Sequence, residues 1–307
     1  MSIKDLITRN SFLYTIAQYI LYWANQIFNY KVERKKFKNK LGYKLNLENP
    51  KSFNEKTIWK KINDRNPLLP VTADKYKVRD YIKKVLGEEK AKEILIPQIF
   101  VTNNPEEIPF EDLPKDFIIK ANHASGWNII VEDSDFNKNK IIEESKRWLK
   151  TPYGLGKLEW AYQKIDRKIV IEKLLKNKKG ELPKDYKFFC IDGMCKLIRV
   201  FFKATNSSTA TCYDRNWNEL SIETDTYSKG PKLKKPIKLN TMLNLAEELS
   251  SPFDFARIDF YFVNQKIYFG EITHYSLSGR IGFIPRKFDF ELGKYWQIRP
   301  KYWENNG

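Results

Sequence analysis

Two β-prone runs separated by a short turn form the strongest local pattern of this 307-residue chain: Ala256-Arg257-Ile258-Asp259-Phe260-Tyr261-Phe262-Val263 and Ile267-Tyr268-Phe269-Gly270-Glu271-Ile272-Thr273. Side chains alternate between the two faces of a strand, so Arg257, Asp259 and Tyr261 share one face of the first run. Glu271 and Thr273 likewise share one face of the second run. Carboxylates in such runs are expensive to bury unless they are paired or bind a cation.

The turn between the runs decides whether the two carboxylates meet. A two-residue turn at Asn264-Gln265 alone would leave Asp259 and Glu271 on opposite faces of the hairpin. A three-residue loop, or a bulge of equal effect, pairs Asp259 with Glu271, and we expect this register with Asn264 or Gln265 at positive φ. The paired carboxylates then suit Mg²⁺ that bridges nucleotide phosphates. The alternative is an ion pair between Arg257 and a carboxylate at the sheet surface.

A second pair of strands lies upstream, around a loop of small residues. The strand Phe117-Ile118-Ile119-Lys120 runs into Ala121-Asn122-His123-Ala124-Ser125-Gly126, and a second strand follows over 127–131. Such a loop lets backbone N–H groups approach phosphate oxygens, and Lys120 supplies a positive charge for the same anion. Taken alone, an ordinary turn glycine and a solvated lysine would give the same pattern.

Two further strands carry candidate nucleotide contacts. Residues 168–175, Lys168-Ile169-Val170-Ile171-Glu172-Lys173-Leu174-Leu175, could offer backbone groups to a base edge, although a buried strand that ends at the surface would look similar. Lys187 lies on the next strand, as a phosphate ligand or a solvated side chain. The Asp192-Gly193 turn predicts a hairpin that places Cys190 opposite Cys195 as packed thiols.

The N-terminal region combines an uncharged stretch with a basic cluster. Residues 11–30 contain no charged residue, and their polar side chains recur at helical spacing, which predicts an amphipathic helix rather than a membrane span. The basic cluster that follows is Lys31, Arg34, Lys35, Lys36, Lys38 and Lys40. Two interpretations stay open: the helix lies on an anionic membrane, or it packs on the protein's own body.

The composition limits the class of protein. There are 55 Lys and Arg against 38 Asp and Glu, with 42% hydrophobic and 15% aromatic residues, a composition that argues against a disordered, collagen or coiled-coil chain. The net charge of +17 favours anionic partners without choosing among them. Three cysteines and two histidines argue against a disulfide scaffold, a Cys/His zinc site and a Ser-His-Asp constellation.

The region before the first strands is predicted to be mainly helical. A helix is predicted over 49–66, and Ser52 and Glu55, which have capping-box spacing, supply its start signal. A second helix is expected around 74–86, where Gly87 ends it, and a strand is expected over 94–101.

The order of these motifs resembles an ATP-grasp nucleotide site. More narrowly, five segments resemble the TupA-like ATP-grasp proteins of bacterial surface-polysaccharide loci, over about residues 46–294. These segments are Ser52-Phe53-Asn54-Glu55-Lys56, Asp74-Lys75-Tyr76-Lys77-Val78-Arg79, Lys120-Ala121-Asn122-His123-Ala124-Ser125-Gly126-Trp127-Asn128, Asp185-Tyr186-Lys187-Phe188-Phe189 and Tyr268-Phe269-Gly270-Glu271-Ile272-Thr273.

The resemblance implies an α+β ATP-grasp fold, in which two α+β lobes enclose a nucleotide cleft behind an N-terminal amphipathic helical extension. The expected divisions are an N-terminal amphipathic and basic segment (1–45), an N-terminal α/β region (46–115), the small lobe (116–175) and the large lobe with the C-terminal tail (176–307). ATP and Mg²⁺ are the implied cofactors.

The resemblance also assigns roles to residues. It implies that Lys120 and Lys187 contact the phosphates, that Ser125 and Gly126 cover them, and that Arg257 faces the transferring phosphoryl group, so Lys187 and Arg257 are the catalytic candidates. The residues expected to hold adenine are Glu172, Lys173 and Leu175. The residues expected to bind Mg²⁺ are Asp259, Glu271 and Thr273.

The implied activity is ATP-dependent ligation through an acyl phosphate, which joins an amino acid or other amine to a carboxyl group of an acidic surface polysaccharide or its precursor. One alternative is a glycosyltransferase or phosphoryl-transferring enzyme of the same pathway, and another is a non-catalytic basic module that binds glycan or membrane. We expect a cytoplasmic protein, with peripheral contact of residues 11–40 with anionic membrane as an open alternative, and no nucleic-acid partner. The stretch His274-Tyr275-Ser276-Leu277-Ser278-Gly279-Arg280 departs from the Pro-Gly loop of many relatives, so the acceptor and the roles of His123 and His274 stay open.

Overall fold

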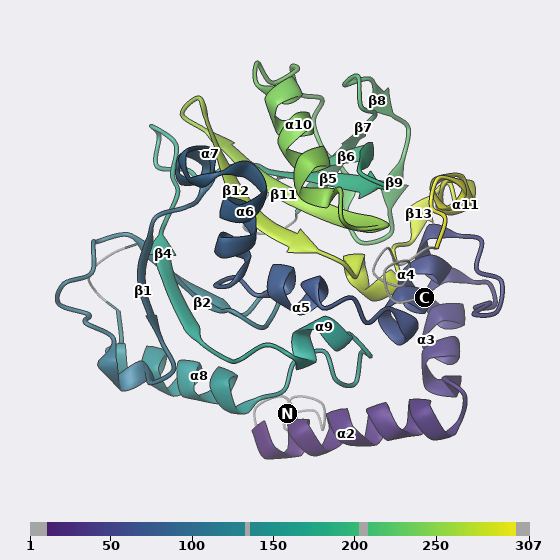
Figure 1. Cartoon of the computed structure of the whole chain (residues 1–307), viewed down its shortest axis with the longest axis horizontal. Helices are drawn as coiled ribbons and strands as arrows, with labels where there is room; N and C mark the ends of the chain where they lie inside the picture. Colours follow the sequence, from purple (N-terminus) through teal and green to yellow (C-terminus); the bar gives the residue numbers. More distant parts are fainter. Residues whose placement is uncertain (1–10, 133–135, 203–207, 299–307) are drawn as a thin grey trace.

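The computed structural model describes residues 11–132, 136–202 and 208–298, and two β-sheets organise them (Figure 1). The smaller sheet is antiparallel, with strand order β1-β4-β2-β3. Its strands are β1 (Gln98–Thr102), β2 (Phe117–Ala121), β3 (Asn128–Val131) and β4 (Ile169–Lys173). Helix α8 (Lys138–Lys150) packs beside it, and Ile141 and Trp148 of α8 share a core with Phe117, Ile119 and Ile171.

The larger sheet has strand order β10-β7-β6-β5-β11-β12, and β8 pairs with β7. Its strands are β5 (Asp185–Ile191), β6 (Met194–Phe202), β7 (Thr209–Tyr213), β8 (Glu219–Leu220), β10 (Ser228–Lys229), β11 (Phe255–Val263) and β12 (Lys266–Thr273). A separate pair joins β9 (Glu223–Thr224) to β13 (Phe283–Ile284). Strands β6, β5, β11 and β12 pair antiparallel with one another, and alternate residues of each strand lie on the same face.

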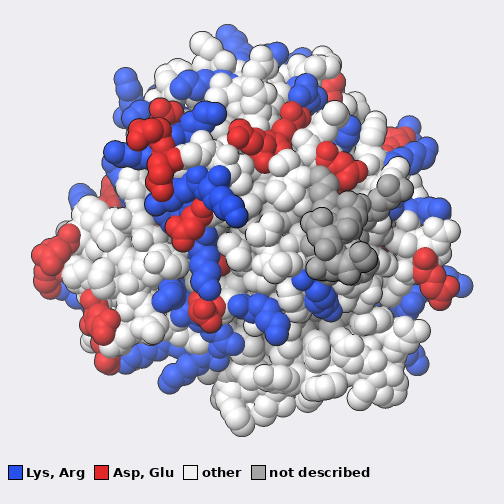
Figure 2. Space-filling view, in the orientation of Figure 1, with Lys and Arg blue, Asp and Glu red and all other residues white. Residues whose placement is uncertain are grey.

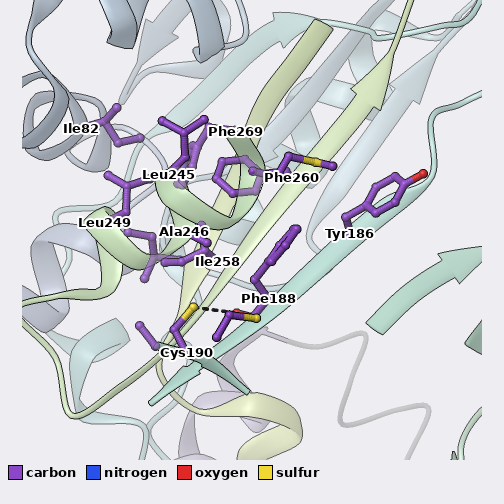
Figure 3. Close-up of a cluster of buried hydrophobic side chains, with 14 of the residues drawn as sticks. Ile82, Tyr186, Phe188, Cys190, Leu245, Ala246, Leu249, Ile258, Phe260 and Phe269 are labelled. Carbon is purple, nitrogen blue, oxygen red and sulfur yellow. Dashed lines mark hydrogen bonds between the residues drawn. The ribbon is translucent and has the colours of Figure 1, made fainter. Parts of the chain in front are cut away.

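One face of the larger sheet is apolar because alternate residues of its strands are large hydrophobes. Phe188, Ile258 and Phe260 are fully buried and pack with Leu249 of α10 (Leu239–Ser250) and Ile82 of α6 (Val78–Leu86), as Figure 3 shows. The remaining helices of this region are α5 (Leu68–Ala73), α7 (Glu88–Ile94) and α9 (Trp160–Gln163). The opposite face of the same strands is therefore left for the polar residues.

The β11–β12 hairpin confirms the predicted pairing of Asp259 with Glu271. The pairing arises from a bulge and not from a three-residue loop. Asn264 (φ 51°) and Gln265 (φ 63°) form a two-residue turn at positive φ, and Val263 pairs with Lys266. The register then shifts between Asp259 and Phe260, so that Asp259 lies opposite Glu271. Gly270 is the extra residue. A Cβ atom there would lie 3.0 Å from the carbonyl oxygen of Asp259, which favours glycine at this bulge.

The other predicted local features are mostly confirmed, with shifted boundaries. Asp192 and Gly193 turn at positive φ, and Cys190 lies opposite Cys195 as a buried free thiol. Ser52 and Glu55 form the capping box of α4 (Phe53–Asn63), which is shorter than the predicted 49–66 because its cap fixes the start at Phe53. The strand predicted over 94–101 is wrong in its first half, since α7 runs to Ile94 and Pro97, which lacks an N–H donor, precedes β1.

The N-terminal helices lie along one margin of the molecule (Figure 1). These are α2 (Ser11–Ile27), a helix as predicted, and α3 (Lys31–Leu41), and the C-terminal helix is α11 (Lys287–Lys294). The side of α2 that faces the body carries polar groups: Gln18 Oε1 accepts from the N–H of Gly156 (3.1 Å), and the buried Asn25 accepts from the N–H of Glu33 (2.9 Å). Residues 1–10 of the predicted 1–45 segment lie outside the described residues.

The apolar side of α2 is exposed. Phe12 is 70% exposed, Ile20 63% and Ile27 69%, so the helix does not use this face to pack on the body. Among the helices that the structure describes, none is long and apolar enough to cross a membrane.

Candidate active site

A row of charged side chains crosses the polar face of the larger sheet. Cross-strand pairing places Glu271 (β12) opposite Asp259 (β11), Asp259 opposite Lys187 (β5), and Lys187 opposite Arg199 (β6). Because each position is one strand from the next, four residues far apart in sequence become neighbours on one surface. Glu271, Asp259 and Lys187 were predicted from the sequence, and Arg199 was not.

Arg257 joins the two carboxylates of this row. Its Nε and Nη2 atoms donate to the two Asp259 carboxylate oxygens, each at 2.7 Å. Nη2 also donates to Glu271 Oε1 and to the hydroxyl of Thr273, each at 3.0 Å, and Nη1 donates to the Ser276 hydroxyl at 3.1 Å. The structure thus brings the predicted metal ligands and the predicted catalytic arginine into one buried cluster, in which the arginine bridges the acids.

Lys187 approaches the same cluster from the neighbouring strand. Its Nζ lies 2.5 Å from Asp259 Oδ2 and 2.7 Å from Asp185 Oδ2. Burial alone would lower the pKa of Lys187, but Asp185 and Asp259 raise it overall. Burial opposes ionisation of Glu271, yet Lys75, Arg257 and Lys187 lower its pKa to about 2. The cluster therefore holds Glu271 as a carboxylate and Lys187 as a cation at neutral pH.

The oxygen donors of the cluster fit a Mg²⁺ ion that also contacts phosphates. Asp259 and Glu271 face one another, and the Thr273 hydroxyl donates to Glu271 Oε1 (3.1 Å). Mg²⁺ in phosphate-transfer sites is bound by one or two carboxylates together with substrate phosphates and waters. Across the described ranges no group of three or more His, Cys, Asp and Glu is placed to hold a metal by itself. The metal assignment of Asp259, Glu271 and Thr273 stays a prediction.

A cavity of about 540 Å³ opens over the row. Its walls bring together predicted residues from both sheets: Ser125, Gly126, Lys187, Arg257, Glu271 and Thr273. Gly126 has φ 78° and open space where a side chain would be, so a bound group can approach its backbone closely. The loop after β2 thus faces the charged row from across the cavity.

A second, smaller cavity of about 50 Å³ is largely apolar. Lys120, Lys173 and Leu175 line it together with Ile118 and Tyr261, so three more predicted residues meet here. Glu172 does not line this cavity. Its carboxylate pairs with Lys120 (2.6 Å) and lies 3.7 Å from Arg79, so its assigned contact with adenine stays a prediction.

Replacing Lys120 with alanine tests this ion pair. We expect Lys120→Ala to weaken binding of a non-hydrolysable ATP analogue by about 10-fold or more, since a charge-assisted contact to phosphate is lost. It should also lower the melting temperature, because the buried Glu172 loses its 2.6 Å ion pair and retains the longer, 3.7 Å contact with Arg79. The double variant with Glu172→Gln should recover the melting temperature but not the affinity. Lys92→Ala, at an exposed lysine of α7 that lines neither cavity, is the control, and unchanged affinity in Lys120→Ala would remove Lys120 from the site.

The two histidines lie outside the charged row. His274 is buried, and its Nε2 lies 2.7 Å from the Thr72 hydroxyl. His123 is buried beside Asn122, with 3.3 Å between Nδ1 and Oδ1. Neither lines the large cavity, which favours structural roles.

Sequence reasoning missed several residues of the site. These are Lys75, which lies near Glu271, and Glu159, Asp185, Arg199 and Tyr227, which line the cavity. Two had a usable signal. Asp185 stands two positions before Lys187, on the same face of the strand. Arg199 is a charged residue inside an apolar run, and burying an unpaired charge is energetically unfavourable, so its presence there indicates a partner or a ligand.

Comparisons with known proteins confirm the predicted family. The family model described as TupA-like ATPgrasp matches residues 55–297, which is most of the chain. The α+β ATP-grasp fold follows from that match. A comparison with curated protein sequences gave no match.

Solved structures with similar folds are distant. D-alanine–D-alanine ligase from Bacillus anthracis is 18% identical, with 66% of this chain and 57% of that chain covered and a TM-score of 0.38. The same enzyme from Helicobacter pylori is 16% identical, with 74% of this chain and 62% of that chain covered and a TM-score of 0.40. The ATP-grasp ligase PsnB, in complex with a phosphomimetic variant of its minimal precursor, Mg and ADP, is 10% identical, with 74% of this chain and 60% of that chain covered and a TM-score of 0.41. The chain spans little more than half the length of these structures, and at such scores they add nothing to the family assignment.

Proposed function

Because this chain belongs to the TupA-like ATP-grasp family, we propose that it is an ATP- and Mg²⁺-dependent carboxylate-amine ligase. It joins an amino acid or other amine to a carboxyl group of an acidic surface polysaccharide or its precursor, in capsule or cell-envelope synthesis. The observation that supports this most is the cluster of Lys187, Arg257, Asp259 and Glu271 beside a cavity that the Ser125-Gly126 loop also lines.

The proposed reaction has two steps. A carboxylate oxygen of the acceptor attacks the γ-phosphorus of ATP, and the bond to the bridging oxygen breaks, which gives ADP and an acyl phosphate. The amine then attacks the acyl carbon, the C–N bond forms, and phosphate leaves as the nitrogen loses a proton. No protein nucleophile is needed. Lys187 and Arg257 would hold and neutralise the reacting oxygens in a site that is already organised.

The nucleotide would occupy both cavities. The apolar cavity with Ile118, Leu175 and Tyr261 suits a base, and Lys120 lies at its edge toward the phosphates. When bound, Mg²⁺ would be held by Asp259 and Glu271 beside Thr273, and it would neutralise phosphate charge.

The remaining wall of the large cavity suits an acidic acceptor. Arg199, at the end of the charged row, lines it together with Lys157 and Arg280, and the chain as a whole carries a net charge of +17. Electrostatic attraction would favour an acidic polysaccharide over a neutral glycan.

Product analysis tests this function. Purified protein is incubated with ATP, Mg²⁺, pools of amino acids and uronic-acid glycans, and we expect ADP together with a glycan whose mass has increased by the amine less one water. Release of a nucleoside diphosphate from a sugar nucleotide, with ATP inert, would favour the glycosyltransferase alternative. Glycan binding without any turnover would favour the non-catalytic module.

We also propose that α2 lies on the anionic inner face of the cytoplasmic membrane. Its exposed apolar residues are Phe12, Leu13, Ile16, Tyr19, Ile20, Trp23 and Ile27. The helix itself has no charged side chain, and Figure 2 shows the uncharged margin that it forms. The adjoining α3 exposes Lys31, Lys35 and Lys38, which complement anionic lipid.

Sedimentation with vesicles that contain phosphatidylglycerol tests the membrane contact. We expect the wild-type protein to bind, and binding to weaken as salt is added. Ile20→Glu should reduce the bound fraction about 10-fold or more, since an apolar side chain is replaced by a charge, whereas Gln26→Glu on the same helix should retain most binding. Wild-type protein that ignores the vesicles at low salt and elutes as a dimer would instead indicate that this face joins two copies of the chain.

A further inference from the structure

Arg199 is a buried cation without a partner among the residues that the structure describes. Its side chain extends from β6, the residue is 1% exposed, and its Nε and Nη1 atoms have no hydrogen-bond acceptor there. The guanidinium lies over two aromatic rings, 5.2 Å from the Phe189 ring centre and 4.9 Å from that of Phe201. Rings attract a cation weakly and do not replace the hydrogen bonds that burial removes.

The charges around Arg199 compensate it only in part. Lys187 lies directly opposite on β5, and the carboxylate of Asp259 is already shared between Lys187 and Arg257. Burial is the largest influence and lowers the pKa of Arg199 to about 10; Arg257 lowers it as well, whereas Cys212, Tyr227 and Asp259 raise it, and the guanidinium remains protonated at neutral pH. A protonated, buried guanidinium whose N–H groups lack acceptors destabilises the free protein, and an anionic ligand that accepts from these groups would remove that cost.

The position of Arg199 relative to the cavity shows what such a ligand would be. Arg199 lines the large cavity, one strand beyond Lys187 and two strands from Asp259, which is a separation of about 10 Å between strands. A ligand group at Arg199 therefore lies on the side of Lys187 away from the paired carboxylates. The planar guanidinium suits a bidentate carboxylate.

We propose that Arg199 binds the carboxylate of the acceptor and positions it beside Lys187 for attack on the nucleotide. This inference rests on the proposed ligase function and names the group that recognises its acidic substrate. Burying the Arg199 charge lowers the stability of the free protein, and a bound carboxylate would compensate that cost. Arg199 is therefore expected to favour substrate binding at the expense of the stability of the free protein.

The variant Arg199→Met separates this role from a structural one. Without ligand, we expect its melting temperature to equal or exceed that of the wild type by about 2 °C, because an unpaired buried charge is replaced by an apolar chain. A structural arginine would give the opposite result, a lower melting temperature.

Binding is then measured by calorimetry with D-glucuronate and L-glutamate as carboxylate probes and D-glucose as the neutral control, each with and without a non-hydrolysable ATP analogue and Mg²⁺. We expect at least one carboxylate to bind the wild type, D-glucose to fail, and Arg199→Met to raise the carboxylate Kd about 10-fold or more while the analogue Kd stays within about two-fold. Arg199→Lys should bind the carboxylate with intermediate affinity. The two probes distinguish a sugar acid from an amino acid.

Several outcomes would overturn the proposal: equal carboxylate affinity in Arg199→Met, loss of analogue affinity in that variant, its destabilisation, or no binding of either carboxylate to the wild type. If the wild type fails to bind the ATP analogue, the ligase function fails instead. The titrations without nucleotide then still test Arg199 by itself.

Discussion

Replacing Arg257 with methionine should abolish ADP formation and destabilise the protein. The guanidinium donates to Asp259 twice and to Glu271 once, and all three side chains are buried or half-buried. Its removal leaves Asp259 paired with Lys187, and Glu271 near Lys75 and Lys187, and the loss of a buried ion partner costs about 3–5 kcal/mol. Loss of a preorganised positive charge beside the transferring group should reduce the rate about 10³-fold. Steady-state ADP release at saturating ATP and urea unfolding measure the two effects.

Two further variants separate catalysis from folding. Arg257→Lys keeps the charge but cannot reproduce the two-pronged contact with Asp259, so it should recover most of the stability and little of the rate. Arg257→Met combined with Asp259→Asn removes the uncompensated charge, and it should regain stability without activity. ADP release by Arg257→Met within about 10-fold of the wild-type rate would show that Arg257 does not act on the reaction.

Lys60→Met should produce the largest loss of stability outside the site. Lys60 is fully buried, and its Nζ lies 2.5 Å from both Asp64 Oδ2 and Asp254 Oδ1. Asp254 also accepts from the indole N–H of Trp296 (2.8 Å), so the cluster joins α4 to the start of β11 and to the C-terminal region. Without the lysine, two buried carboxylates face one another, and we expect the free energy of unfolding to fall by about 3–5 kcal/mol.

Removing the carboxylate charges identifies the cause of this loss. Lys60→Met combined with Asp64→Asn and Asp254→Asn contains no unpaired carboxylate in this cluster, so it should recover most of the lost free energy of unfolding. The control is Lys77→Met, which removes a partly exposed lysine 3.1 Å from Asp166 and should change the free energy by less than about 1 kcal/mol. A triple variant as unstable as Lys60→Met would indicate lost packing rather than unpaired charge.

The arrangement of residues along each strand was determined by the sequence itself. Strict alternation placed Arg257 and Asp259 on one face of β11, with Ile258 and Phe260 on the other, because the side-chain period of a strand is two whatever surrounds it. The capping box at Ser52 and the turn at Asp192-Gly193 were likewise predicted, since each depends on residues only a few positions apart.

Register and partners across the fold were settled only by the tertiary structure. The sequence required that Asp259 meet Glu271, but the choice between a longer loop and a bulge at Gly270 depends on the close approach of the Asp259 carbonyl from the paired strand. Helical periodicity showed that α2 has two faces. Which of them packs inward depends on the contact of Gln18 with Gly156, 138 positions along the chain.

The least predictable features are the buried charges. Lys60 finds Asp254 194 positions away, and Arg199 becomes conspicuous only because the folded strands around it bring no acceptor to two of its nitrogen atoms. A side chain's type and its spacing from neighbours are local properties of the sequence, whereas the cost of its charge depends on which groups the complete fold places within a few ångströms of it. The sequence therefore determined the strands and most of the charged groups proposed to act in the cleft, and the packing of the two sheets decided which of those charges are neutralised and which are left for a ligand.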